Sequence, residues 1–200
     1  MKPLANCNVA FKEWAAVCAA LAAGRQTIIL RKGGIHEGRE GFRIQHNEFW
    51  LYPTRFHEAT ESLTPDAEEY IRRARAIPRE AGMVPLRHFA VVEEVRELVT
   101  EEAALRWEGL HVWSEATVRQ RFHYRRPGLF LLVVRVFSLP AAIAVAETAE
   151  MAGCKSWVTL PEPVSTGGLA PVLSDEQFAA ATKAIEVAMT GGLPAGGQQG

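Results

Sequence analysis

The sequence predicts an α+β fold: a mixed, largely antiparallel sheet that is curved or partly closed into a barrel, with flanking helices. The predicted elements run in the order helix, strands, helix, strands, helix, and their long, unequal connections differ from regular βαβ winding. Slips in strand alternation and Gly at strand ends indicate the bulges that a curved sheet requires. We expect a single domain over residues 1–190 and a flexible, Gly-rich tail over residues 191–200.

The chain is expected to begin with a helix and two strands. Apolar residues at helical spacing predict the helix over residues 9–23. The β-branched run TIILRK, residues 27–32, predicts the first strand. The second strand is predicted over residues 42–52, and a change of parity in its apolar residues indicates a bulge at Asn47 and Glu48.

The middle of the chain is expected to alternate helices with one long strand. Pro53-Thr54 should end the preceding strand, and a helix with Pro in its first turn is predicted over residues 63–76. β-Branched residues favour a long, bulged strand over residues 86–99. Two short helices, each with a hydroxyl residue at its N-cap, are predicted over residues 100–107 and 114–124.

The C-terminal part contains the clearest strand. Residues 128–137 are apolar almost without interruption, so this strand is expected to be central and covered on both faces. Arg135 within it needs a partner or a cavity, and Pro140 should end the strand. A compact strand follows over residues 156–160, and Ser174 begins the last helix in a capping box.

The composition indicates a soluble protein of the cytoplasm. A hydrophobic content of 48%, a charged content of 22% and a net charge of −1 are ordinary values, so they exclude a strongly basic DNA-binding or membrane-binding chain. No apolar run approaches the roughly 20 residues that span a bilayer. Cys7, Cys18 and Cys154 are widely spaced, which predicts neither a disulfide framework nor a structural zinc site. Lys12 and Glu13 interrupt any N-terminal signal sequence.

The stretch from Ile28 to Glu58 is the candidate functional region, because it combines a Gly-Gly turn, three histidines and several charges. Lys32 with Gly33 and Gly34 offers backbone N–H groups beside a cation, which suits a phosphate. A plain hairpin turn with a solvated Lys32 explains the same residues equally well.

A second candidate is the most basic local segment, residues 119–126. Its arginines are interleaved with Phe122, His123 and Tyr124, a pattern that suits contacts with a nucleic-acid backbone and stacking on a base. Charge runs of this kind also occur on helix faces that only contact water.

The histidines of the central stretch suggest a metal site as an alternative. His36, His46 and His57 with Glu58 would suit Zn²⁺ if the two strands pair around the turn. The simpler interpretation is that these histidines are hydrogen-bonded or exposed and shape a bulge, because no compact ligand motif surrounds them.

Three groups of residues resemble a bacterial family known as domain of unknown function 1802. They are Lys12-Glu13-Trp14; Arg31-Lys32-Gly33-Gly34-Ile35 with Glu37, His46, Phe49, Pro53-Thr54 and His57; and Gly153-Cys154-Lys155-Ser156-Trp157 with Pro171-Val172-Leu173. The resemblance covers most of residues 9–190. It implies a bacterial protein and, through relatives fused to nuclease-like domains, an association with nucleic acid.

Lys32, Glu37 and Arg39 are also similar to the Gly-x-Lys-x-x-Glu-x-Arg signature of PUA and ASCH barrels, although here Glu37 follows Lys32 by five positions. This resemblance implies binding of RNA or modified bases. Our main hypothesis is therefore a non-enzymatic binding module for nucleic acid or a nucleotide-like anion. The residues expected to line its ligand site are Lys32, Gly33, Gly34, Glu37, Arg39, His46, Thr54, His57, Arg121, Arg125 and Arg135.

Two alternatives stay open at this point. One is a metal-dependent hydrolase or nuclease that uses the histidine cluster with Glu37 or Glu58. The other is a structural or protein-interaction domain. The sequence identifies neither a cofactor nor an oligomeric state.

Overall fold

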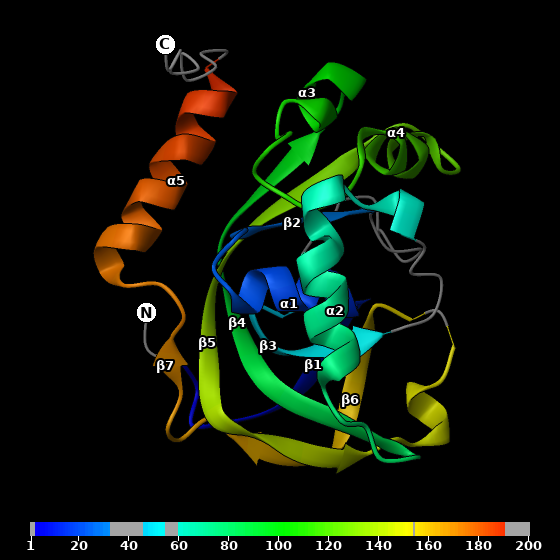
Figure 1. Ribbon diagram of the computed structural model, residues 1–200, viewed down its shortest axis with the longest axis vertical. Helices are drawn as coiled ribbons and strands as arrows, with labels where there is room; N and C mark the ends of the chain where they lie inside the picture. Colours follow the sequence, from blue (N-terminus) through cyan, green and yellow to red (C-terminus); the bar gives the residue numbers. More distant parts are fainter. Residues whose placement is uncertain (1–2, 33–45, 55–59, 154, 191–200) are drawn as a thin grey trace.

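The computed structural model describes residues 3–32, 46–54, 60–153 and 155–190. Within these residues, seven strands form one mixed sheet that is not closed, and helices flank it (Figure 1). This arrangement confirms the predicted α+β class. The predicted tail over residues 191–200 lies outside the described residues.

The elements follow one another from β1 to α5. The strands are β1 Asn6–Trp14, β2 Ile28–Arg31, β3 Glu48–Thr54, β4 Met83–Leu98, β5 Leu129–Ala146, β6 Trp157–Ser165 and β7 Ala170–Pro171. The helices are α1 Ala15–Ala22, α2 Glu68–Ala76, α3 Glu101–Leu105, α4 Glu115–His123 and α5 Asp175–Met189. Short 3-10 turns lie at Thr60–Ser62, Pro65–Ala67 and Ala149–Met151.

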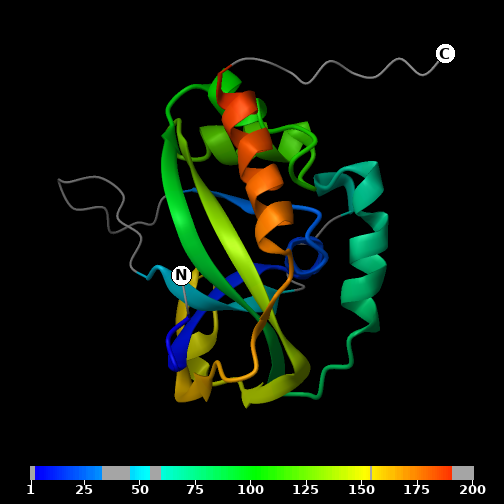
Figure 2. The same cartoon turned by 90° about the vertical axis from the view of Figure 1, so that its left-hand side faces the viewer.

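The sheet has the order β2-β5-β4-β3-β1-β6, and β7 pairs with β5. Only the pairing of β1 with β3 is parallel among the described strands, so the sheet is mixed and largely antiparallel as predicted. The register of the long β4–β5 ribbon shifts between Leu86 and His88 and again between Val92 and Glu94. Such bulges strengthen the local bend of a strand. Figures 1 and 2 show the resulting curvature of β4 and β5.

The curled sheet brings its two ends together. β2 lies at one end of the strand order, and β1 and β6 lie at the other. Nevertheless, the guanidinium of Arg31 in β2 donates a hydrogen bond to the hydroxyl of Ser156, directly before β6 (2.7 Å). We call this approach of β2 to β1 and β6 the seam. Within the described residues, side chains and not strand pairing join the seam.

Helices cover both sides of the β4–β5 ribbon. α5 lies along one side, and α1 and α2 lie on the other (Figures 1 and 2). The two faces of β3 contribute to two separate cores. Phe49 and Leu51 pack into the larger core, and Trp50 and Tyr52 into the smaller one. Alternation along one strand therefore positions the sheet between two apolar layers.

The predicted helix over residues 9–23 is half wrong. Residues 6–14 form strand β1, which pairs with β3 and β6, and only Ala15–Ala22 are helical. The pairing with two neighbouring strands overrides the local helical spacing of Val9, Trp14 and Val17. This correction matters for the site, because Glu13 is a buried residue of a strand with neighbours on both sides.

Pro53 and Thr54, where the second strand was predicted to end, are the last two residues of β3. The strand end predicted at Pro140 is wrong, because β5 continues past it to Ala146. Pro140 falls in the interval where the β4–β5 register shifts, between the pairs His88–Ser138 and Leu86–Ile143. A proline is tolerated at such a bulge because its missing N–H is not needed for the ladder. Residues 42–45 lie outside the described part, so the bulge before β3 stays a prediction.

Several local predictions are confirmed. β2 and the long, bulged β4 are strands, and β5 pairs with both of them. The hydroxyls of Thr100 and Ser114 accept hydrogen bonds from backbone N–H groups at the starts of α3 and α4. Ser174 and Gln177 form the predicted capping box of α5. None of the helices in the described part combines the length and hydropathy of a bilayer-spanning segment.

Candidate functional site

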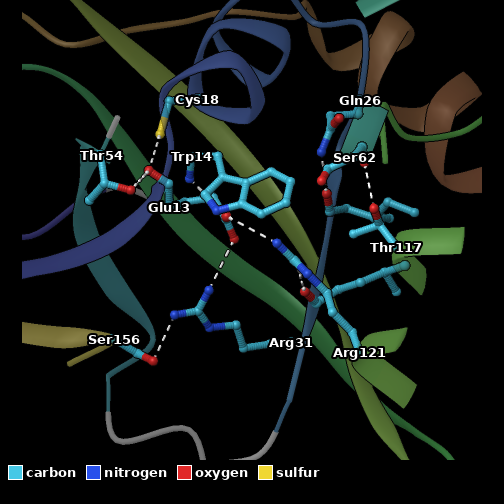
Figure 3. A network of polar contacts seen from close by, with 12 residues as sticks. Glu13, Trp14, Cys18, Gln26, Arg31, Thr54, Ser62, Thr117, Arg121 and Ser156 are labelled. Carbon is cyan, nitrogen blue, oxygen red and sulfur yellow. Dashed lines mark hydrogen bonds and ion pairs between the residues drawn. The ribbon is translucent and has the colours of Figure 1, made fainter. Parts of the chain in front are cut away.

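Glu13 is the centre of a polar network at the seam (Figure 3). Its side chain has 0% exposure, although it lies near the end of β1. The backbone N–H of Trp14 donates to Oε1 (2.8 Å), and the backbone carbonyl of Glu13 accepts from the hydroxyl of Thr54 (3.1 Å). A carboxylate without water requires positively charged partners.

Two arginines supply the positive charge. Nη1 of Arg31 lies 3.3 Å from Oε2 of Glu13, and Nη2 of Arg121 lies 4.0 Å from Oε1 (Figure 3). The two guanidiniums come from β2 and α4, so three separate elements meet at one carboxylate. Among the described residues, two positive charges and one negative charge give the centre a net positive charge.

Each guanidinium is held by further contacts. Arg31 donates to Ser156 and lies over the ring of Phe11 (4.6 Å to the centroid). Such contacts fix the plane of an arginine side chain and reduce the entropy that it loses on binding a ligand.

Arg121 lies beside two indole rings. Its Cζ atom is 4.5 Å from the ring centroid of Trp14 and 5.1 Å from that of Trp113, and its Nη1 donates to the carbonyl of Leu30 (3.3 Å). Burial lowers the pKa of Arg121 to about 10, and the charge of Glu13 opposes this shift. Arg121 therefore remains protonated at neutral pH.

An aromatic cluster borders Arg31. The ring of Trp157 lies 4.7 Å from Phe11 and 5.0 Å from Phe49, and His46 approaches the same indole at 5.3 Å. Trp157 and His46 are half-buried. The site thus combines fixed cations with aromatic surface.

Two polar anchors position α4 and β2 around the centre. The hydroxyl of Thr117 in α4 donates to the carbonyl of Ser62 (2.7 Å). Gln26 donates to the carbonyl of Ile28 (2.9 Å) and accepts from the backbone N–H of Val112 (3.1 Å). The first bond holds α4 against the 3-10 turn at Thr60–Ser62, and the others hold the start of β2 against the segment before α4 (Figure 3).

Three of the predicted site residues lie at this centre. Arg121 contacts Glu13 directly, Thr54 binds its backbone, and His46 joins the adjoining aromatic cluster. Lys32 has a different environment. Its ammonium group donates to the carbonyls of Phe122 (2.7 Å), Gly128 (2.8 Å) and Arg126, which engage all three of its hydrogens.

Arg125 and Arg135 do not contact Glu13. Arg125 is exposed, has a positive φ of 63° and lies over the ring of Tyr124. Arg135 forms an ion pair with Asp175 at the start of α5, which confirms the prediction that this charge has a partner. Its guanidinium also lies over the ring of Phe178.

The remaining predicted ligand residues Gly33, Gly34, Glu37, Arg39 and His57 lie outside the described residues. The same holds for His36 and Glu58, so the structure describes only His46 of the proposed metal ligands. In residues 3–32, 46–54, 60–153 and 155–190, no group of three His, Cys, Asp or Glu side chains has a geometry suited to a metal ion.

Sequence reasoning missed Glu13, Arg31 and Ser156 as members of one site. Each belongs to a different stretch that carries the family resemblance. The presence of all three residues in stretches that resemble the same family was the signal that could have identified them as one site. The predicted helix over residues 9–23 obscured it, because that prediction gave Glu13 no neighbouring strands.

The fold and this centre define an α+β domain whose open, curled sheet is joined at its seam by a buried carboxylate and two arginines. The family model "Domain of unknown function (DUF1802)" matches residues 10–184, and the chain belongs to this family. This result confirms the resemblance identified from the three stretches. No match was found among curated proteins.

The chain is also similar to solved structures of ASCH proteins. The crystal structure of ASCH from Zymomonas mobilis has a TM-score of 0.42 and 12% identity, covering 88% of this chain and 93% of that one. A single-residue variant of the same protein gives a TM-score of 0.42 and 11% identity, with 88% and 96% coverage.

Proposed function

We propose that this protein is a non-enzymatic binding module for nucleic acid or a nucleotide-like anion, with a phosphate bound against Arg31 and Arg121. The observation that carries the proposal is the net positive charge that the described residues give the centre. Glu13 neutralises only one of two converging guanidiniums. An anion would complete the charge balance at a place where water is partly excluded.

The arginines have both the exposure and the donors that such contacts need. Their side chains are 21% and 19% exposed. Hydrogen bonds within the described part of the chain engage two of the five N–H hydrogens of Arg31 and one of those of Arg121. A planar guanidinium suits bidentate phosphate binding, and the aromatic contacts hold both planes before a ligand arrives.

The aromatic cluster favours a nucleotide over a simple inorganic anion. Trp157 and His46 are half-buried beside Arg31, so a base can stack on their accessible faces while its phosphate contacts the arginines. Stacking of this kind tolerates every base, and we therefore expect weak sequence preference.

Fluorescence anisotropy with labelled single-stranded RNA and DNA, at about 50 and 200 mM salt, tests this proposal. We expect salt-sensitive binding by the native chain. Arg31→Gln and Arg121→Gln should each weaken it about tenfold or more, because each removes charged hydrogen bonds. Arg75→Gln is the matched control, because Arg75 is an exposed arginine of α2 and should leave binding unchanged.

Stability measurements must accompany these titrations, since each variant leaves the Glu13 carboxylate with one arginine instead of two. Arg31→Lys provides a variant that keeps the charge and loses the planar fork. We expect its affinity to lie between those of the native chain and Arg31→Gln. Equal affinity of Arg31→Gln and the native chain, with both folded, would refute the proposed contact.

A further inference from the structure

A cavity of about 370 Å³ lies between α1, α2 and strands β3 and β4. Its volume is within the range of roughly 300–1,000 Å³ that is typical of small-molecule sites. Buried residues from the three sides contribute to its wall, among them Cys18, Leu51 and Ala74. Arg73 and Arg87 are exposed members of the lining. The cavity therefore has an apolar floor and a charged rim.

The charges at the rim have one sign. Arg73, Arg79 and Arg87 line the cavity, and none of its described lining residues is acidic. Arg73 is paired with Glu69 and Arg79 with Glu147, and neither glutamate lines the cavity.

Arg87 differs from the other two arginines. Its Nε donates to the carbonyl of Leu139 (3.0 Å), and no carboxylate of the described residues lies within ion-pair distance. A guanidinium beside an apolar floor, with no acidic partner in the described part of the chain, is complementary to an anionic head group.

His88 adds a neutral polar group to the same wall. Burial, assisted by the charge of Arg87, lowers the pKa of His88 to about 4. The imidazole is therefore uncharged at neutral pH and has one N–H donor and one acceptor nitrogen. It can orient a ligand without adding a second charge.

We infer that this cavity binds a small amphipathic organic monoanion, a carboxylate with an aliphatic or aromatic body. The body lies against Leu51, Ala74 and Ile77, and the carboxylate meets Arg87 at the rim. The site is separate from the Glu13 centre. Neither Glu13, Arg31 nor Arg121 lines the cavity, and its apolar floor does not suit a polynucleotide.

Isothermal titration with sodium octanoate tests the inference, with octanol as an uncharged probe of the same chain length. We expect saturable binding of one octanoate per chain. Arg87→Gln should weaken octanoate binding about fivefold and leave octanol binding unchanged. Arg72→Gln is the matched control on α2, because Arg72 is exposed and does not line the cavity.

A second variant fills the cavity without altering a core position. Ala142 is exposed and lines the cavity from β5, so Ala142→Leu should reduce the binding of both probes while the chain stays folded. Absence of saturable octanoate binding would overturn the inference. So would octanoate binding that is unaffected by both Arg87→Gln and Ala142→Leu. Arg31→Gln should retain octanoate binding, which separates this cavity from the proposed nucleotide site.

Discussion

The carboxylate of Glu13 and the guanidinium of Arg31 lie 3.3 Å apart, although three strands separate β1 from β2 in the sheet. Their contact is possible only because β4 and β5 bend and the sheet curls. The candidate site is therefore a product of sheet curvature: the same geometry that nearly closes the barrel brings the charged groups together. Four predictions test this structure.

Removal of the central carboxylate should destabilise the fold. In Glu13→Gln, Arg31 and Arg121 face each other without a negative charge, so we expect the free energy of unfolding to fall by about 2–4 kcal/mol. Urea denaturation measures the change. If the variant folds, its affinity for the labelled RNA should rise, because the negative charge is gone. A fold of native stability would show that the ion pairs contribute little.

The glycine at the end of α1 should not tolerate a side chain. Gly24 has a φ of +69°, and a Cβ atom there would lie 2.5 Å from Cδ2 of Leu173. Gly24→Ala should therefore reduce the free energy of unfolding by about 3 kcal/mol. The control is Gly82→Ala, which has a φ of +73° but no described atom within 4 Å of the new Cβ. Gly82→Ala should reduce the free energy of unfolding by about 1 kcal/mol. Equal reductions in the two variants would contradict the close packing at Gly24.

Stability should decrease in mild acid because of His111. Burial lowers its pKa to about 4, and the charges of Arg25 and Arg121 act in the same direction. The unfolded chain, with an ordinary pKa of about 6.5, binds more protons between about pH 6.5 and pH 4. The stabilisation that comes from keeping His111 neutral is therefore fully present above about pH 6.5, its pKa in the unfolded chain. It is lost as the pH falls toward about 4, its pKa in the folded chain.

The variant His111→Leu isolates this effect from other titrating groups. As the pH falls from about 6.5 to 4, the free energy of unfolding of this variant should decrease by about 3 kcal/mol less than that of the native chain. Denaturation at a series of pH values provides the measurement. Parallel pH profiles of the two chains would show that His111 does not titrate as described.

Lys32 should act on stability and not on anion binding. Its ammonium group binds carbonyls at the end of α4 and before β5, so Lys32→Met should cost about 2 kcal/mol of folding free energy. We expect its RNA affinity to stay within about twofold of native. A loss of RNA affinity as large as that of Arg31→Gln would show that Lys32 also contacts the anion, as its position beside Gly33 and Gly34 first suggested.

Much of the fold was predictable because local chemistry determines it. Hydroxyl caps mark the starts of α3, α4 and α5, and the uninterrupted apolar run in β5 reflects neighbours on both faces. The strand β1 was not predictable, since its apolar residues satisfy a helical spacing as well. Its pairing with β3 and β6 comes from residues far away in the chain.

The site was predictable only in part for the same reason. Arg121, Thr54 and His46 stood out by residue type. Arg121 and Thr54 share Glu13 as a partner, and the helix predicted over residues 9–23 gave no reason to select this glutamate. Arg135 is charged and lies in an apolar strand, so its need for a partner was predictable, whereas the identity of Asp175 was not.

The seam has a consequence for the order of folding. The β4–β5 ribbon pairs two successive strands of the chain, but Glu13, Arg31, Arg121 and Ser156 are distributed over residues 13–156. Contacts between distant residues form late, because long loops must close first. During synthesis the ribbon can assemble before Ser156 emerges, so the contacts around Glu13 are completed after the ribbon has formed.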